Sequence, residues 1–309
     1  MTSTGKSIGR LSGSARSRRE WSAFDVANVF VMIVVMMITL YPFLHVFALA
    51  LNESSDTVKG GITIFPRKFT LENFQTIFAY GKIPQAFLIS VLRTVIGTVT
   101  SVLACALVAY VLSRRDFQLR SFFSKYFAVT MYISGGLIPG FLLMRDLNLL
   151  NTFAVYILPG MVHVFNIFLI RSYMDNLPLE LQESAKMDGA SDFTIFWRVI
   201  LPLCTPVLAT VALFVAVGQW NSWFDTYLYN SASPHLTTLQ FELMQILQST
   251  QASAGSAPRS EEMQQQLEQV TPDSIKMAIT VVTVFPILLV YPFLQRYFVQ
   301  GMTLGAVKG

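Results

Sequence analysis

The chain has 309 residues, of which 53% are hydrophobic and only 13% are charged. A soluble domain carries about 25% charged residues, so this composition argues against a soluble protein and favours a membrane protein. The formal net charge of +4 comes from basic residues dispersed along the chain, which gives little support to nucleic-acid binding.

Six stretches are apolar enough to cross a bilayer, which requires about 20 predominantly apolar residues in a helix. They are residues 25–51, 86–112, 122–144, 153–170, 199–224 and 276–297. Ala48-Leu49-Ala50 resembles a signal-peptidase site, but the apolar run before it exceeds the roughly 7–15 residues of a signal peptide, so a retained helix is predicted. The predicted fold class is therefore all-α, a polytopic membrane bundle of six transmembrane helices. This domain occupies residues 25–300, between tails at 1–24 and 301–309.

Basic residues predict how this bundle is oriented, because cytoplasmic loops are enriched in Lys and Arg. Besides the N-terminal tail, they mark the link between the second and third spans and the ends of the fourth and sixth. These residues are Arg114, Arg115, Arg120, Arg171 and Arg296. With six spans, all of these places lie on one side, so that side and both termini are predicted to be cytoplasmic.

The loop at 228–275 is then predicted to be extracytoplasmic. Its stretch "STQASAGSAPRSEEMQQQLEQ" is low in apolar content and is predicted to be flexible in part. Before it, "LTTLQFELMQIL" has helical periodicity, with Leu239, Leu243, Ile246 and Leu247 near one face. This helix either packs against the bundle or docks a partner.

Signatures of catalysis and of metal or nucleotide binding are missing from the sequence. It has no GxxxxGK[ST] phosphate loop and no GxSxG nucleophile elbow. His45, His163 and His235 lack the spacing of a metal site, and Cys105 and Cys204 read as small buried apolar residues. No enzyme activity, catalytic residue, metal site or cofactor is predicted for this chain.

Charged groups within the predicted spans are almost absent as well. No Asp or Glu lies centrally in a span, which argues against an ion- or proton-coupled transporter, although carbonyls alone can hold such ions. Arg93 is the one clear exception, and it either snorkels to the interface or faces a wet cavity. The predicted bundle is therefore interpreted as a transport pathway whose energy must come from another polypeptide. An ion-coupled secondary transporter and a membrane-anchored interaction protein are the alternatives.

Residues 175–203, "DNLPLELQESAKMDGASDFTIFWRVILPL", interrupt the apolar chain with a polar helix–turn–helix. Pro178 suits the first turn of a helix, and Gly189 can adopt the left-handed conformation that ends it. Ser191 or Asp192 can cap a second helix that continues into the fifth span. Such an element either transmits a push from a cytoplasmic partner or lies on the membrane surface.

The order Glu183-Ser184-Ala185, then Gly189, then Ile200-Leu201-Pro202 resembles the EAA loop of ABC importer permeases. The wider string "LPLELQESAKMDGAS" is similar to the carbohydrate-uptake branch, of which the maltose importer's smaller permease is the familiar member. The resemblance covers nearly the whole chain, from "YPFLHVFALALN" through "AYVLSR" to "FVQGMTLGAVKG". One departure is Ser184, which stands where alanine is usual.

This resemblance implies a type I ABC importer permease fold and a non-catalytic subunit of a carbohydrate importer in the bacterial cytoplasmic (inner) membrane. The implied partners are a second homologous permease, a cytoplasmic ATPase dimer that binds ATP and Mg²⁺, and an extracytoplasmic solute-binding protein. In that family the loop, here 175–198, docks in a cleft of the ATPase. The coupling residues carried over are Glu183 as polar contact, Ala185 as close-packing position, Gly189 as turn, and with them Ser184, Met187 and Asp188.

A sugar pathway is expected to combine aromatic faces with amide partners, and "VGQWNSWFDTYLY" ends the fifth span. The candidate pathway residues are Gln219, Asn221, Trp220, Trp223, Asn166 and Arg93, with His163 and Asp225 as weaker candidates. The alternatives are interfacial tryptophans and amides that tie helices together. The ending "MTLGAVKG" and "SVLRTVIGT" resemble a subgroup for uronate-containing oligosaccharides such as alginate, and Arg93 would suit an acidic sugar.

Overall fold

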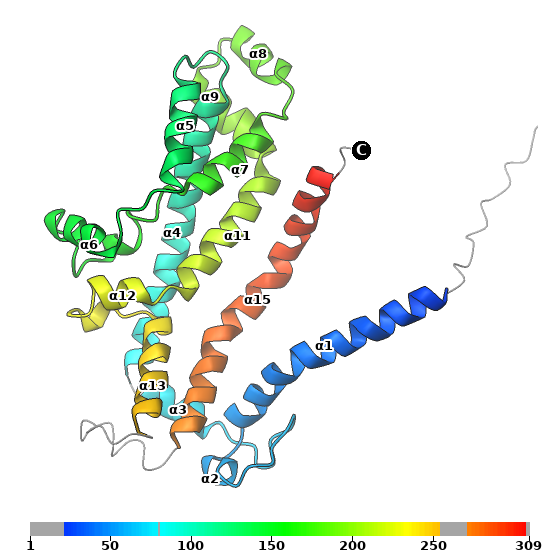
Figure 1. Ribbon diagram of the computed structural model, residues 1–309, viewed down its shortest axis with the longest axis vertical. Helices are drawn as coiled ribbons and strands as arrows, with labels where there is room; N and C mark the ends of the chain where they lie inside the picture. Colours follow the sequence, from blue (N-terminus) through cyan, green and yellow to red (C-terminus); the bar gives the residue numbers. More distant parts are fainter. Residues whose placement is uncertain (1–21, 80, 254–270, 307–309) are drawn as a thin grey trace, which may run out of the picture.

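A computed structural model describes residues 22–79, 81–253 and 271–306 of the chain. Within these ranges the regular structure is helical, and the one β-type contact is an isolated bridge between Asn52 and Phe69. The elements, labelled in Figure 1, are α1 (Ala23–Ala50), α2 (Ser54–Thr57), α3 (Glu72–Ala79), α4 (Lys82–Ser113), α5 (Arg120–Thr130), α6 (Leu137–Asp146), η1 (Phe153–Tyr156), α7 (Val164–Met174), α8 (Glu180–Met187), α9 (Asp192–Ile195), η2 (Phe196–Ile200), α10 (Leu201–Leu203), α11 (Thr205–Asn221), α12 (Phe224–Tyr229), η3 (Pro234–Leu236), α13 (Leu239–Ser253) and α15 (Pro272–Ala306). The predicted all-α class is confirmed.

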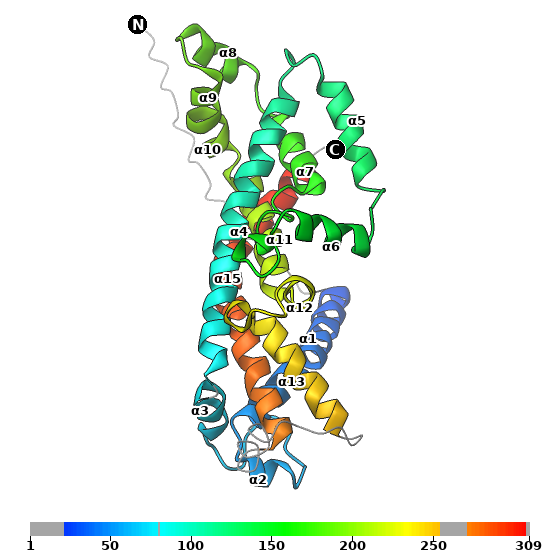
Figure 2. The same ribbon diagram turned by 90° about the vertical axis from the view of Figure 1, so that its left-hand side faces the viewer.

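Helix α4 is the axis of the molecule, and it runs from the end that carries α2 and α3 to the end that carries α8 (Figures 1 and 2). It packs along α11 and α7, while α15 packs against α1, α3, α11 and α13. One apolar cluster joins α4, α7, η2 and α11 near the α8 end, and a second joins α4, α13 and α15 near the α2 end. These two cores hold the helices whose polar residues form the candidate sites.

The predicted first span is a continuous helix, α1, but only at its end, residues 44–50, are successive residues partly or fully buried against the rest of the described chain. A capping box starts it, in which the Asp25 carboxylate accepts the Ser22 N–H at 3.0 Å. Among its residues only Ala48 and Ala50 are buried, and the helix runs away from the bundle in Figure 1. Because its exposed surface is almost entirely apolar, α1 requires an apolar environment such as lipid or another subunit.

Two other predicted spans are also continuous helices. α4 contains the run 86–112, and α15 contains the run 276–297. The α15 backbone continues to Ala306, six residues into the predicted tail at 301–309. Most of the other predicted tail, 1–24, lies outside the described residues.

The predicted third span, 122–144, is wrong as a single helix. It is divided into α5 and α6, and Figure 2 shows the two helices running in different directions. Gly136 lies in the link between them, directly before α6, and its φ of +87° is a backbone conformation that cannot continue a right-handed helix. Pro139 then lies in the first turn of α6, where proline is tolerated.

The predicted fourth and fifth spans are interrupted too. The helix predicted over 153–170 begins only at Val164, because Pro159-Gly160 separates η1 from α7. In the run 199–224, the axis of residues 192–203 meets the axis of α11 at 81°. Pro202 and Pro206 flank this bend, and each removes a backbone N–H from the helical ladder.

In the described part of the chain, three helices are long and apolar enough to span a membrane, or four if the bent pair counts as one. α7 is a shorter apolar helix of 11 residues, which is about 16 Å of rise, against a hydrocarbon core of about 30 Å. The total of six spans therefore stays a prediction.

The helix predicted from "LTTLQFELMQIL" is present as α13, and its apolar face packs on the bundle. Leu239 and Leu243 are buried in the second core, with Ile246 and Leu247 partly buried beside them. Of the two interpretations left open, packing accounts for this face. Most of the stretch predicted to be flexible, 254–270, lies outside the described residues.

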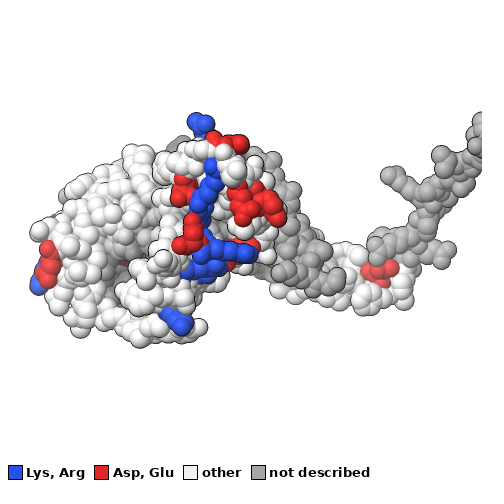
Figure 3. Space-filling view, turned by 90° about the horizontal axis from the view of Figure 1, so that it is seen from above, with Lys and Arg blue, Asp and Glu red and all other residues white. Residues whose placement is uncertain are grey.

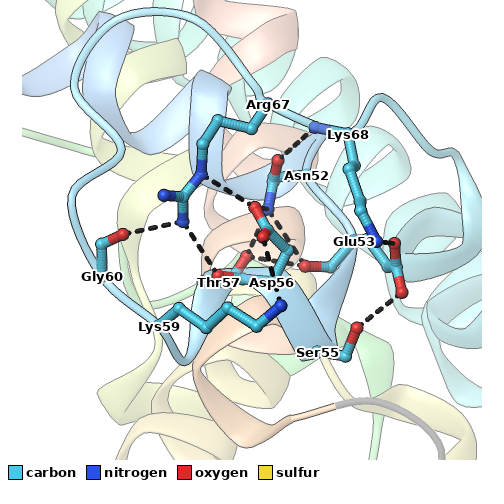
Figure 4. Close-up of polar contacts among 9 residues, drawn as sticks. All are labelled: Asn52, Glu53, Ser55, Asp56, Thr57, Lys59, Gly60, Arg67 and Lys68. Atoms are coloured by element: carbon cyan, nitrogen blue, oxygen red, sulfur yellow. Dashed lines mark hydrogen bonds and ion pairs between the residues drawn. The ribbon is translucent and has the colours of Figure 1, made fainter.

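The loop around α2, residues 51–71, is held by a dense group of polar contacts (Figure 4). Asp56 accepts hydrogen bonds from Arg67 Nε at 2.9 Å and from Asn52 Nδ2 at 3.3 Å. Loss of solvent raises the pKa of Asp56, but these two hydrogen bonds and the nearby charges of Arg67 and Lys59 together lower the pKa overall. The pKa of Glu53 is lowered by hydrogen bonds from Ser55 and from Lys68.

This loop should lose its order in acid. A carboxyl whose folded pKa is depressed contributes stability above its unfolded pKa, about 4, and loses it as the pH falls through the folded pKa. Hydrogen exchange of the amides of residues 52–70, corrected for intrinsic rates, should therefore show protection at pH 7 that declines below about pH 4. The variant Asp56→Asn should show a smaller decline, whereas equal declines in both proteins would contradict this origin.

Candidate functional site

The polar hairpin of residues 180–195 forms at one end of the molecule as the sequence predicts. α8 ends at Met187, and Gly189 reverses the chain with φ +79°. The reversal is closed by hydrogen bonds from Gly189 N to Lys186 O and from Ala190 N to Ala185 O, each 3.0 Å long. Ser191 caps α9, because its hydroxyl accepts the Thr194 N–H at 3.3 Å. Pro178 lies two residues before α8 and not in its first turn.

The six residues carried over as coupling residues divide into an exposed set and one inward residue. Five are exposed: Glu183, Ser184, Met187, Asp188 and Gly189. Met187 is the most prominent of them, with 88% of its surface exposed. Ala185 is partly buried instead, and it packs against the apolar cluster beneath the hairpin. The hairpin therefore presents a mixed polar and apolar surface while Ala185 seats it on the body of this chain.

The hairpin is mechanically continuous with α11. α9 leads without a loop into the π-helical turn η2, then into α10 and, through the bend at Cys204, into α11. Ile195, Phe196 and Ile200 of this connection are at most 1% exposed. The connection is packed in the first core, and such close-packed interiors have low compressibility and transmit strain.

The end that carries the hairpin is also strongly charged. Figure 3 looks onto it and shows Lys and Arg side chains in a row with Asp and Glu on both sides. A cavity of about 380 Å³ lies between the hairpin and the α4–α5 link. Its charged lining residues are Arg114, Arg115, Arg120, Lys186, Asp116, Asp175 and Glu183.

A second cavity, of about 470 Å³, lies between α4, α7 and α11. Its size is within the range of about 300–1,000 Å³ that is usual for small-molecule sites. The lining combines the apolar Val155, Phe165, Phe214 and Val215 with the polar residues Arg93, Tyr156, His163, Asn166, Gln219, Ser222 and Asp225. We refer to it as the polar pocket.

Arg93 lines this pocket and is held there by several partners. Its side chain is 2% exposed, so it does not snorkel to an interface. Its guanidinium donates to both carboxylate oxygens of Asp225 and, through Nε and Nη2, to Oε1 of Gln219 at 3.1 and 3.0 Å. The guanidinium also stacks over the Tyr156 ring, 4.4 Å from its centroid. The charge of Arg93 is therefore neutralised by this chain's own carboxylate.

Of the six candidate pathway residues, the structure brings Arg93, Gln219 and Asn166 to the polar pocket. Gln219 crosses over α4 at Gly97, where an added Cβ would lie 2.9 Å from the Gln219 side chain. The weaker candidates His163 and Asp225 line the pocket too.

The other three candidates do not line this pocket. Trp220 is buried on another side of α11, where its indole donates to Thr283 O at 3.0 Å. The Asn221 amide donates to Val217 O within its own helix. Trp223 lies past the end of α11 and contacts Phe224. Each step along an α-helix rotates the side chain by about 100°, so the neighbours of Gln219 face elsewhere.

Two features of the site were missed from the sequence. The Arg93–Asp225 pair joins residues 132 positions apart, and Tyr156 comes from η1, which was assigned to a transmembrane helix. A signal for the first was available, because a buried guanidinium needs an acidic partner and Asp225 is the first carboxylate after the fifth apolar run. The second had no clear signal in the sequence.

Comparisons with known proteins agree on one family. The family described as "Binding-protein-dependent transport system inner membrane component" matches residues 101–304. Protein LplC of Bacillus subtilis is 38% identical over 287 residues, which cover 93% of this chain and 95% of that protein. The polygalacturonan/rhamnogalacturonan transport system permease protein YtcP of Bacillus subtilis is 37% identical, covering 93% of this chain and 98% of that protein.

A solved structure has the same fold. It is the crystal structure of a bacterial ABC transporter involved in the import of the acidic polysaccharide alginate, and one of its chains is similar to this one. That similarity has a TM-score of 0.80 at 29% identity, and it covers 89% of this chain and 96% of the other. The fold resemblance stated from the sequence is confirmed, and an ion-coupled secondary transporter is not favoured.

Proposed function

Because the chain belongs to the family of binding-protein-dependent transport system inner membrane components, we propose that it is the permease subunit through which an ATP-driven importer moves oligosaccharides. The observation that carries this proposal is the continuity between the exposed hairpin and α11, whose Gln219 lines the polar pocket. A partner that moves the hairpin thereby changes the position of a pocket residue. This is the geometry that an externally powered transporter requires.

The partner at the hairpin is a cytoplasmic ATPase dimer, which binds the ATP and Mg²⁺ that this chain has no motif for. Glu183, Ser184, Met187 and Asp188 form the contact surface, because they are exposed around the turn at Gly189. An extracytoplasmic binding protein delivers the substrate at the opposite end. A homologous second permease completes the pathway, as in other importers of this family. Both termini then lie on the cytoplasmic side.

The substrate that we propose is an acidic oligosaccharide that contains uronic acid. Support comes from two relatives, one named for polygalacturonan and rhamnogalacturonan transport and one involved in alginate import. The charge of Arg93 supports it less than the sequence suggested, because Asp225 already pairs with this guanidinium. Gln219, Asn166 and Ser222 instead offer the pocket neutral groups for sugar hydroxyls.

The test is substrate-stimulated ATP hydrolysis by the complex purified from its native membrane in mild detergent. With the cognate binding protein present, oligogalacturonate or oligoalginate should stimulate hydrolysis, and neutral oligosaccharides of the same length should not. Stimulation by neutral sugars alone would overturn the proposed substrate class. Purification of the chain without any ATPase subunit would overturn the importer itself.

A further inference from the structure

Arg114 is the first residue after α4, and its guanidinium is bound by groups from several segments of the chain. Nε and Nη2 donate to the two carboxylate oxygens of Asp116 at 3.0 and 2.7 Å. Nη2 also pairs with the Asp192 carboxylate at 3.1 Å. Nη1 donates to Gln182 Oε1 at 3.2 Å and to the Tyr110 hydroxyl at 3.3 Å. One side chain thus joins α4, the α4–α5 link, α8 and α9.

Lys186 of α8 reinforces the same group. Its ammonium lies 3.4 Å from the Asp116 carboxylate and 3.6 Å from the Asp192 carboxylate. The Tyr110 hydroxyl adds a hydrogen bond to the Asp192 carbonyl at 3.3 Å. We call Arg114, Asp116, Lys186 and Asp192 the charge clasp. It contains two cations and two anions, so all four charges are paired.

The electrostatics of the clasp depend on Arg114. The side chains of Asp116 and Asp192 are 61% and 63% exposed, so each ion pair taken alone is weakened by water. Arg114 is only 11% exposed, and its planar fork binds Asp116 with two parallel hydrogen bonds. The hydrogen bonds from Arg114 lower the pKa of Asp116 well below its usual range, so this carboxylate stays charged at neutral pH.

Chain connectivity alone attaches the hairpin to α7 on one side and to η2 and α11 on the other. The clasp adds a direct polar connection to α4. The same helix carries Arg93, 21 residues and about 30 Å away, in the wall of the polar pocket. Arg93 of α4 faces Gln219 of α11 and Asp225 of α12, the helix that follows α11, so moving only α11 and α12 would separate these two residues from Arg93.

We propose that Arg114 is a positioning residue that makes the hairpin and the end of α4 move as one body, so that a push on the hairpin reaches both helices of the pocket. The expected effect on transport rests on the proposed importer function. That Arg114 holds the hairpin to α4 depends on this chain alone. Arg114 touches no substrate, and it acts through Asp192 and Gln182 of the hairpin.

The transport test compares Arg114→Gln with Arg115→Gln in the reconstituted importer. Arg115 is exposed, lines the same cavity and has no hydrogen bond or ion pair in the described part of the chain, so it is a matched charge control. Arg114→Gln should keep ATP hydrolysis but lower the sugar transported per ATP by about fivefold or more, within the usual range of coupling between sites. Arg114→Lys should be intermediate, because lysine keeps the charge and loses the fork.

A distance measurement tests the clasp without an ATPase. Spin labels at Met187→Cys and Val111→Cys, both exposed sites, report how firmly the hairpin is held to α4 in the full chain in membranes. The native Cys105 and Cys204 are buried. Arg114→Gln and Asp192→Asn should each broaden the distance distribution, and Arg115→Gln should leave it narrow. An unchanged width in both clasp variants would overturn the clasp, whereas absence of ATP-driven transport in the unmodified complex would instead overturn the proposed function.

Discussion

Replacing Asp225 by alanine should destabilise the folded chain by about 3 kcal/mol, because it leaves the Arg93 guanidinium buried without its anion. Removing one partner of a buried pair costs about 3–5 kcal/mol, and the 23% exposure of the Asp225 side chain places the effect at the lower end. Gln219 and the Ser222 carbonyl would remain as neutral acceptors. Equilibrium unfolding in mild detergent, followed by tryptophan fluorescence, measures the change.

Two further variants test whether the loss of stability comes from leaving a buried charge unpaired or from losing any carboxylate. The double variant Arg93→Met/Asp225→Leu removes both charges and should recover stability to within about 1 kcal/mol of the unmodified chain. Asp146→Ala removes a carboxylate from the exposed pair with Arg145, so it should change stability by less than about 0.5 kcal/mol. A loss in Asp225→Ala no larger than in Asp146→Ala would show that the Arg93–Asp225 pair is not a buried structural element.

Substituting valine for Gly189 should reduce uptake by about tenfold or more while the membrane helices stay folded. The residue has φ +79°, and an added Cβ would meet no atom within 4 Å, so the effect is conformational and not a clash. A β-branched residue in this conformation costs on the order of 1–3 kcal/mol, which the exposed hairpin avoids by changing its turn. If the changed turn weakens the free energy of binding to the ATPase by about 1.4 kcal/mol, the affinity falls tenfold.

Asparagine at the same position is the matched control. It tolerates the left-handed conformation, so Gly189→Asn should keep most of the uptake and most of the co-purifying ATPase. Uptake of labelled oligosaccharide into proteoliposomes and the yield of ATPase after affinity purification are the two measurements. Equal losses in the valine and asparagine variants would show that the backbone conformation of Gly189 is not what transport requires.

Local features of the molecule could be predicted from the sequence because their causes are local. The apolar runs of α1, α4 and α15 are long enough to be helices in any apolar surrounding. The turn at Gly189 and the cap at Ser191 depend on the backbone of a few consecutive residues. The EAA-like motif, whose residues stand in a fixed order, predicted the permease family, and the family match over residues 101–304 confirmed it.

The sequence contains the residues that interrupt the remaining predicted spans, but the high hydropathy of those runs led to their prediction as continuous helices. Gly135-Gly136 and Pro159-Gly160 lie within runs that are apolar enough to read as continuous helices. A hydropathy average counts these residues as weakly apolar and ignores their backbone conformation. Turn chemistry decided the structure at both places, which is why α5 and α6 are separate and α7 starts late.

By itself the sequence determined the helical class, three continuous long helices, the polar hairpin with its glycine turn, and the family. Only the tertiary structure decided which polar side chains meet. The packing of α4 against α11 places Arg93 beside Gln219 and Asp225, and directs Trp220 elsewhere. Ala185 likewise turned out to seat the hairpin on its own chain. Such contacts join residues far apart in the chain, so they depend on how helices cross and not on any local pattern.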